Sequence, residues 1–208
     1  LGFSSMLDEE DLAPQEKSIF IGIINQNGEQ LLRIIDDIID ISKIEAGQLK
    51  VALESFILNP VLENLRSIFS SKCQSQELIF RTIIAPNTPE TIFSDPYKIK
   101  RILNILLSNA VKYTNEGHIY LRIHPDNRRP GFVCFEVEDS GVGIAAENQK
   151  AIFERFSQES TDSSIRNGGT GLGLAIAKGL TNLLKGKIGL RSDKGKGSQF
   201  YFSIPAEE

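Results

Sequence analysis

The sequence predicts an α+β fold, a two-layer arrangement in which a mixed sheet is covered on one face by helices and preceded by one long helix. Apolar residues recur at helical spacing over residues 15–46, and strand and helix patterns are mixed from residue 48 onward. Turn signals such as residues 126–131 join neighbouring strands as hairpins, which argues against a strictly parallel sheet. We therefore expect a helical domain at residues 1–47 and an α/β domain at residues 48–208.

The composition is that of a globular protein, with 40% hydrophobic and 24% charged residues among 208. A net charge of −4 offers no basic face, so we expect no binding to nucleic acid. No apolar run approaches the length of a membrane span, and Cys73 and Cys134 have no ligand-like neighbours in sequence. Free thiols in a reducing cytoplasm are the expectation. The chain does not begin with Met, and we expect it to be a piece of a longer protein.

Residues 15–46 carry the heptad pattern of a helix that packs against other helices. The seam alternates steps of four and three through Phe20, Ile24, Asn27, Leu31, Ile34, Ile38 and Ile41, and it is widened by Leu32, Ile35 and Ile39. Residues 1–7 resemble the end of an apolar helix, which is too short to cover this face. We therefore expect a second copy of the chain to cover it, as in a four-helix bundle. Asn27 either sets the register or is solvated near a frayed end.

The remaining elements follow from local patterns. Gly47 is expected as the cap of the long helix, and residues 49–56 as a strand. Asn59 is expected to cap a helix over residues 60–71, and Asp95 a strong helix that runs to about Tyr113. A further helix follows residue 173. The other expected strands are residues 78–84, 91–94, 118–124, 132–138, 187–192 and 199–204.

A glycine cluster, Gly168-Gly169-Thr170-Gly171-Leu172-Gly173, precedes that last helix. Glycine loses much backbone freedom on folding, so a cluster needs a compensating reason. One reason is a phosphate site, because backbone N–H groups and the helix dipole then point the same way. The other is a flexible hinge. It is not a P-loop, because no Gly-Lys-Ser/Thr follows a strand.

Two further polar stretches could bind a nucleotide. Asn109, Lys112 and Tyr113 share one region of the helix after Asp95, where Asn109 either caps a neighbouring loop or ligates Mg²⁺. Asp139-Ser-Gly-Val-Gly143 follows a strand, and its carboxylate could accept a hydrogen bond from an adenine amine. Asp before Gly is also common in turns. A short aromatic segment at residues 152–156 and a polar, lid-like stretch at residues 157–164 come next.

Taken in order, these stretches resemble the ATP-binding domain of sensor histidine kinases. Asn109 with Lys112, Asp139-x-Gly-x-Gly143, residues 153–156 and Gly169-x-Gly171-x-Gly173 look like the N, G1, F and G2 boxes of that family, and residues 195–200 look like its last glycine box. Residues 31–47 resemble the second helix of its dimerisation and phosphotransfer hairpin. The resemblance covers nearly the whole chain and implies a Bergerat-type ATP-binding fold.

The resemblance implies a role for each matching residue. Asn109 would ligate Mg²⁺ and act in catalysis with Lys112, which would approach the phosphates of ATP, and Tyr113 would lie near the nucleotide. Asp139 would hold the adenine amine, in a pocket shaped by Gly141 and Gly143. The residues expected to contact the phosphates from the lid and the glycine loop are Arg166, Gly169, Thr170, Gly171, Leu172 and Gly173.

The same resemblance implies a homodimer, a response-regulator receiver domain as partner, and a cytoplasmic location, either in a soluble protein or in a membrane-bound sensor. Its acceptor histidine would lie before residue 1. We expect His118 and His124 to be exposed strand residues, neither an acceptor nor a metal ligand. Ile105 stands where family members often carry Asn and related ATPases carry Glu, and it cannot act as a base. A regulatory nucleotide-binding module and a gyrase- or Hsp90-like ATPase are the alternatives.

Overall fold

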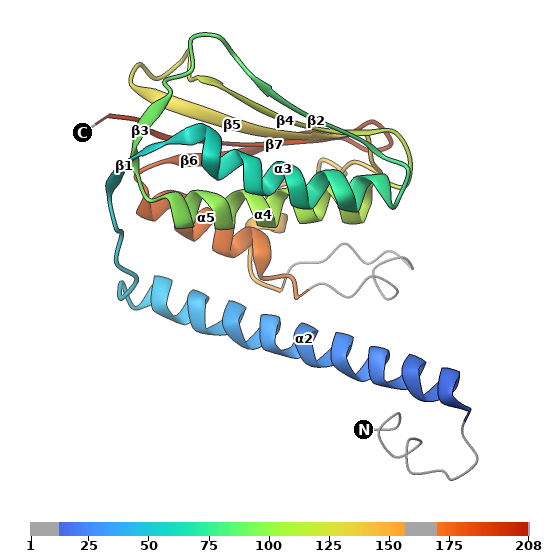
Figure 1. Cartoon of the computed structure of the whole chain (residues 1–208). Coiled ribbons are helices and arrows are strands. Elements are labelled where there is room, and N and C mark those ends of the chain that lie inside the picture. Colours follow the sequence, from blue (N-terminus) through green and yellow to red (C-terminus); the bar gives the residue numbers. More distant parts are fainter. Residues whose placement is uncertain (1–12, 157–169, 208) are drawn as a thin grey trace.

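The computed structural model describes residues 13–156 and 170–207. Helix α2 (Pro14–Glu45) lies beside an α/β unit in which helices α3 (Leu58–Gln74), α4 (Pro96–Tyr113) and α5 (Gly173–Leu183) cover one face of a sheet (Figure 1). The predicted layers, a mixed sheet covered on one face by helices after one long helix, are confirmed. The expected apolar helix end at residues 1–7 and the lid-like stretch at residues 157–164 lie outside the described residues.

Five strands form the main sheet in the order β2-β4-β5-β7-β6. Their bounds are Ile79–Ile84 for β2, His118–Pro125 for β4, Phe132–Asp139 for β5, Lys187–Asp193 for β6 and Gly197–Pro205 for β7. Strands β2 and β4 are parallel, whereas the other neighbouring pairs are antiparallel. Strands β1 (Glu54–Ile57) and β3 (Thr91–Ser94) pair with each other in a separate two-stranded sheet.

The core lies between the inner face of the main sheet and the three helices that cover it. Its largest fully buried side chains include Phe69, Phe135, Phe202, Leu62, Leu65 and Leu106. The rings of Phe135 and Phe202 stack with their centroids 4.8 Å apart across β5 and β7. Burying each such side chain contributes about 1.5–3 kcal/mol. This layer therefore stabilises the packing of the three helices on the sheet.

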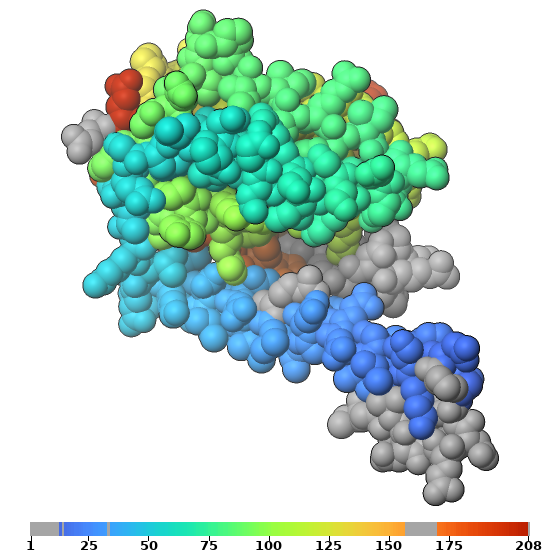
Figure 2. All heavy atoms as spheres, in the orientation of Figure 1, coloured from blue at the N-terminus to red at the C-terminus, as the bar shows by residue number. Residues whose placement is uncertain are grey.

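Helix α2 has a different environment. It ends before Gly47, whose φ of +63° is the left-handed conformation that glycine adopts readily. Apolar residues of its predicted seam and of the face that widens it remain exposed, including Leu31 at 59% and Leu32 at 64%. The helix lies under the α/β unit and its N-terminal part projects beyond it (Figure 2). Where α2 does touch the unit, Ile44 packs so closely on Gly179 of α5 that a Cβ there would lie 2.9 Å from its Cγ2.

Two local predictions were wrong. Of the strand expected at residues 49–56, only residues 54–56 lie in a strand, β1, because the N–H of Ala52 donates to the Asp95 carboxylate and not to a neighbouring strand. Helix α3 begins at Leu58, not after an Asn59 cap, and the N–H of Leu58 donates to the Glu90 carbonyl. Pro60 thus occupies the third helical position, where its missing N–H would have had no helical partner.

Candidate functional site

Helix α4 carries the first group of predicted site residues. It begins at the Asp95 cap, whose Oδ1 accepts from the N–H of Lys98 at 3.1 Å. Asn109 is half-buried on the last part of this helix. One turn earlier, Ile105 contacts the start of α5, since a Cβ on Gly173 would lie 3.3 Å from its Cγ2. Helix α4 therefore contacts the N-terminal end of α5 through Ile105, one turn before Asn109.

Asp139, at the end of β5, is only 5% exposed. Its Oδ1 accepts two backbone hydrogen bonds, from Gly141 at 2.9 Å and from Ser198 at 3.3 Å. Burial raises the pKa of this carboxyl above its ordinary value, and the two backbone N–H groups oppose that rise. The result is a fixed, poorly solvated acceptor of the kind that a ligand donor stabilises.

Gly141 and Gly143 lie where backbone segments meet. A Cβ on Gly141 would lie 2.2 Å from the carbonyl oxygen of Tyr113, and one on Gly143 would lie 2.0 Å from that of Asp193. Gly143 also has a φ of +63°. The loop after Asp139 is thus held between the end of α4 and the turn from β6 to β7, which explains both glycines.

The glycine loop before α5 is described from Thr170 onward. Thr170 Oγ1 accepts from the N–H of Leu172 at 3.1 Å and donates to Asp37 of α2 at 3.3 Å. Gly171 has a φ of +68°, and its carbonyl accepts from the N–H of Phe156. Predicted residues Arg166 and Gly169 lie outside the described residues.

Two grooves border these residues. One, of about 670 Å³, lies between the ends of α3 and α4 and is lined by Phe69, Val111 and Lys112 among others. The other, of about 640 Å³, runs along Asp139 and the turn between β6 and β7. Lys112 and Asp139 thus line different grooves, and Lys112 Nζ lies 4.8 Å from the centre of the Tyr113 ring.

Contacts between α2 and the α/β unit were not predicted from the sequence. Arg101 of α4 forms ion pairs with Asp37 at 3.3 Å and with Asp40 at 2.6 Å. Arg155 pairs with Glu45 near the end of α2. Asp37 therefore links the glycine loop, through Thr170, to α4, through Arg101. Residues so distant in sequence leave no local signal of such pairing.

Comparison with known protein families identifies the class of this α/β unit. Residues 94–208 match the family described as "Histidine kinase-, DNA gyrase B-, and HSP90-like ATPase". The chain belongs to this family.

Named relatives narrow the resemblance. The chain is 35% identical over 206 residues to the sensor histidine kinase GacS of Pseudomonas protegens, covering 98% of this chain and 22% of GacS. It is 37% identical over 207 residues to hybrid signal transduction histidine kinase B of Dictyostelium discoideum. This match covers 99% of this chain and 10% of that kinase. The chain therefore spans at most about a quarter of these relatives, and the predicted resemblance to sensor histidine kinases is confirmed.

A solved structure supports the same assignment. Full-length ShkA in complex with AMPPNP superposes with a TM-score of 0.80 at 26% identity, covering 99% of this chain and 42% of ShkA.

Within residues 13–156 and 170–207, none of the helices is long and apolar enough to cross a membrane.

Proposed function

We propose that this chain is the ATP-binding catalytic part of a sensor histidine kinase, residues 48–208, joined to the second helix of its dimerisation hairpin, within residues 1–47. The observation that carries the proposal is the buried carboxylate of Asp139, held by two backbone donors in a chain of this family. Because both protein donors use Oδ1, Oδ2 is the oxygen proposed to accept from the exocyclic amine of adenine.

The residues present fit a bound ATP·Mg²⁺. Mg²⁺ takes few protein ligands and leaves the others to phosphate and water, so the amide oxygen of half-buried Asn109 suffices. When bound, Mg²⁺ supplies charge stabilisation at the phosphates. Lys112 would add a cation, and Tyr113 would lie beside the nucleotide. The backbone of the loop from Gly169 to Gly173, with Arg166 from the lid, would complete the phosphate contacts.

The proposed reaction is phosphoryl transfer from ATP to a histidine outside this sequence. The bond between the γ-phosphorus and its bridging oxygen breaks, ADP leaves, and an imidazole nitrogen forms the new bond to phosphorus. Positioning and charge stabilisation suffice for such a transfer. Ile105 supports transfer over hydrolysis, because its side chain cannot deprotonate water. The phosphoryl group would then pass to an aspartate of a response-regulator receiver domain.

The exposed apolar seam of α2 supports a homodimer. Leu31, Leu32, Ile35 and Ile38 are all exposed large apolar side chains on one helix. Pairing with the same helix of a second copy, and with the first helix of each hairpin, would bury them.

The test uses the longer parent protein, incubated with ATP labelled in the γ-phosphate. The proposal predicts an acid-labile, base-stable phosphoryl group on the protein, which is typical of phosphohistidine. Asn109→Ala should abolish labelling. Asn104→Ala is the matched control, because the amide of Asn104 donates to Lys100 of its own helix at 3.0 Å. Steady release of free phosphate without labelling would favour a gyrase- or Hsp90-like ATPase. ATP binding without labelling and without phosphate release would favour a regulatory module.

A further inference from the structure

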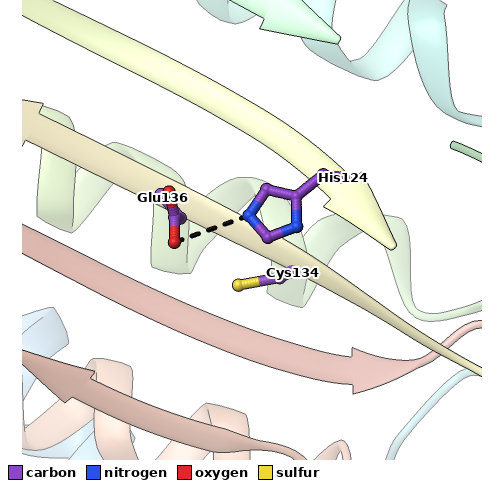
Figure 3. Close-up of side chains that lie close together, drawn as sticks. All are labelled: His124, Cys134 and Glu136. Carbon is purple, nitrogen blue, oxygen red and sulfur yellow. Dashed lines mark ion pairs between the residues drawn. The ribbon is translucent and has the colours of Figure 1, made fainter. Parts of the chain in front are cut away.

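The outer face of the main sheet carries a cluster of three potential metal ligands. Residues of β4 and β5 alternate between the core and this face, so His124, Cys134 and Glu136 point outward together (Figure 3). His124 lies directly opposite Cys134 in the antiparallel ladder, and Glu136 is the next outward residue of β5. The cluster lies on the helix-free face, away from the helix-covered face that carries α4 and α5 (Figure 1).

The ligand atoms are already close. One imidazole nitrogen of His124, the Cys134 sulfur and one Glu136 oxygen all lie within 4.8 Å of one another. His124 Nε2 is 3.4 Å from Glu136 Oε1. Ligand atoms around tetrahedral zinc lie roughly 3.5 Å apart, given bond lengths of about 2.0–2.3 Å. The three ligand atoms would therefore have to approach by about 1 Å at most to fill three of the four positions.

The neighbours of the cluster orient it for a cation. His124 Nδ1 lies 2.8 Å from the Pro125 carbonyl, which can only accept, so Nδ1 carries the hydrogen. In the neutral ring Nε2 then presents its lone pair to the Glu136 carboxylate, whose other oxygen accepts from Gln199 at 3.1 Å. Two acceptors that face each other are stabilised by a cation between them, which is either a proton on Nε2 or a metal ion. A backbone carbonyl on the second imidazole nitrogen is also the usual arrangement behind a metal-bound histidine.

We propose that His124, Cys134 and Glu136 bind one divalent transition-metal ion, with Zn²⁺ as the ion that fits best. Imidazole nitrogen, thiolate sulfur and carboxylate oxygen are all zinc ligands, and water would take the fourth position. Binding exchanges the thiol proton for the metal, and that proton goes to solvent. The proposal is independent of the kinase function, because no residue of the nucleotide site takes part.

Metal binding has to remove the proton of the Cys134 thiol, which has a cost in this buried position. Cys134 is 6% exposed, and burial raises the pKa of its thiol to about 12, with the carboxylates of Glu136 and Asp126 adding to the rise. The thiol of Cys134 is therefore protonated at neutral pH. The cluster was not predicted from the sequence, since His124 is ten residues from Cys134 and Glu136 alone is a weak signal of a metal site. The turn at residues 126–131 was the available signal, because it pairs His124 with Cys134.

A second histidine on the same face provides a matched control. His118 Nε2 lies 3.5 Å from Glu138 Oε1, almost the same separation as in the proposed site. Ser140 lies next to His118 on the neighbouring chain segment and is bonded to its backbone, and it offers a hydroxyl where the proposed site has a thiol. Arg122 forms a two-pronged ion pair with Glu138. The His118–Glu138 pair therefore already has a cation, the Arg122 guanidinium, and it lacks a thiol ligand.

The test titrates the chelator-treated 208-residue chain with Co²⁺ and Zn²⁺. We expect one equivalent of Co²⁺ to produce thiolate-to-cobalt charge-transfer absorption, and Zn²⁺ to displace it and raise the melting temperature. Cys134→Ser should abolish the absorption, and His124→Gln should weaken Zn²⁺ binding by at least about tenfold. Cys73→Ser and His118→Gln should bind as the unaltered chain does.

Far-ultraviolet circular dichroism establishes that each variant is folded. Absence of the thiolate band in the unaltered chain would overturn the proposal. Equal Zn²⁺ affinity for Cys134→Ser and the unaltered chain would do the same, as would equal losses for His118→Gln and His124→Gln.

Discussion

Two buried aspartates at the ends of strands, Asp95 and Asp139, have pKa values that are shifted in opposite directions. Asp95 is 1% exposed and Asp139 is 5% exposed. Burial acts to raise the pKa of Asp95, but hydrogen bonds from the Lys98 ammonium, at 2.5 Å, and from the N–H groups of Ala52 and Lys98 outweigh it, so that this pKa is lowered. Among the residues that the structure describes, Asp139 has two backbone donors, both on one oxygen, and its pKa is raised.

The difference separates a structural carboxylate from a binding one. Asp95 finds a cation and enough donors inside the protein, and it joins the start of α4 to the segment before β1. Asp139 is positioned equally firmly but is left short of stabilising donors. An amine from a ligand would supply what the fold does not.

The largest effect is expected at Asp95. Asp95→Ala leaves the Lys98 ammonium and two backbone N–H groups without their acceptor, and we expect a loss of about 2–4 kcal/mol in the free energy of unfolding. Urea denaturation measures it. Asp126→Ala is the control, since Asp126 accepts one local bond from the N–H of Arg128 and its loss should cost less than about 1 kcal/mol. Equal losses for the two variants would remove the distinction between Asp95 and an ordinary turn residue.

A smaller effect with a defined pH dependence is expected at Asp139. Because its pKa is raised in the folded state, the charged form weakens folding above the folded pKa, and this penalty disappears below the unfolded pKa. Asp139→Asn should therefore be more stable than the unaltered chain at neutral pH and converge with it in acid. Urea unfolding at a series of pH values tests this. For Asp95 the sign is reversed: its contribution is lost as pH falls through the lowered folded pKa. A loss of stability for Asp139→Asn at neutral pH would show that Asp139 is structural too.

The smallest effect is expected at a third aspartate, Asp37. The pKa of Asp37 is raised, because the effect of burial outweighs the opposing effect of Arg101. Asp37 and Arg101 are partly exposed, so their ion pair should be worth about 0.2–1 kcal/mol. A double-mutant cycle with Asp37→Asn and Arg101→Gln measures this coupling in urea unfolding. The same cycle with exposed Asp36→Asn should give a value near zero. A coupling above 1 kcal/mol would mean that α2 is held to the α/β unit far more firmly than a surface ion pair allows.

The sequence predicted what local patterns determine. Helix α4 follows from Asp95 and Pro96, and the hairpin from β4 to β5 follows from the turn at residues 126–131. Local patterns could not give the start of α3, because its first N–H is satisfied by Glu90, a residue far along the chain. They also could not reveal that the Tyr113 carbonyl leaves no room for a side chain at Gly141, nor that Thr170 donates a hydrogen bond to Asp37. The roles of Asn109 and Lys112 stay predictions.

The adenine role of Asp139 is the central claim, and a comparison of ATP with inosine triphosphate tests it most directly. Inosine triphosphate has a carbonyl oxygen in place of the adenine amine, so it would face the Asp139 carboxylate with a second acceptor. Calorimetric titration should show the unaltered chain binding ATP at least about tenfold more tightly. Asp139→Asn should lose most of that preference, whereas Glu138→Gln should keep it. An unchanged preference for ATP in Asp139→Asn would contradict the account.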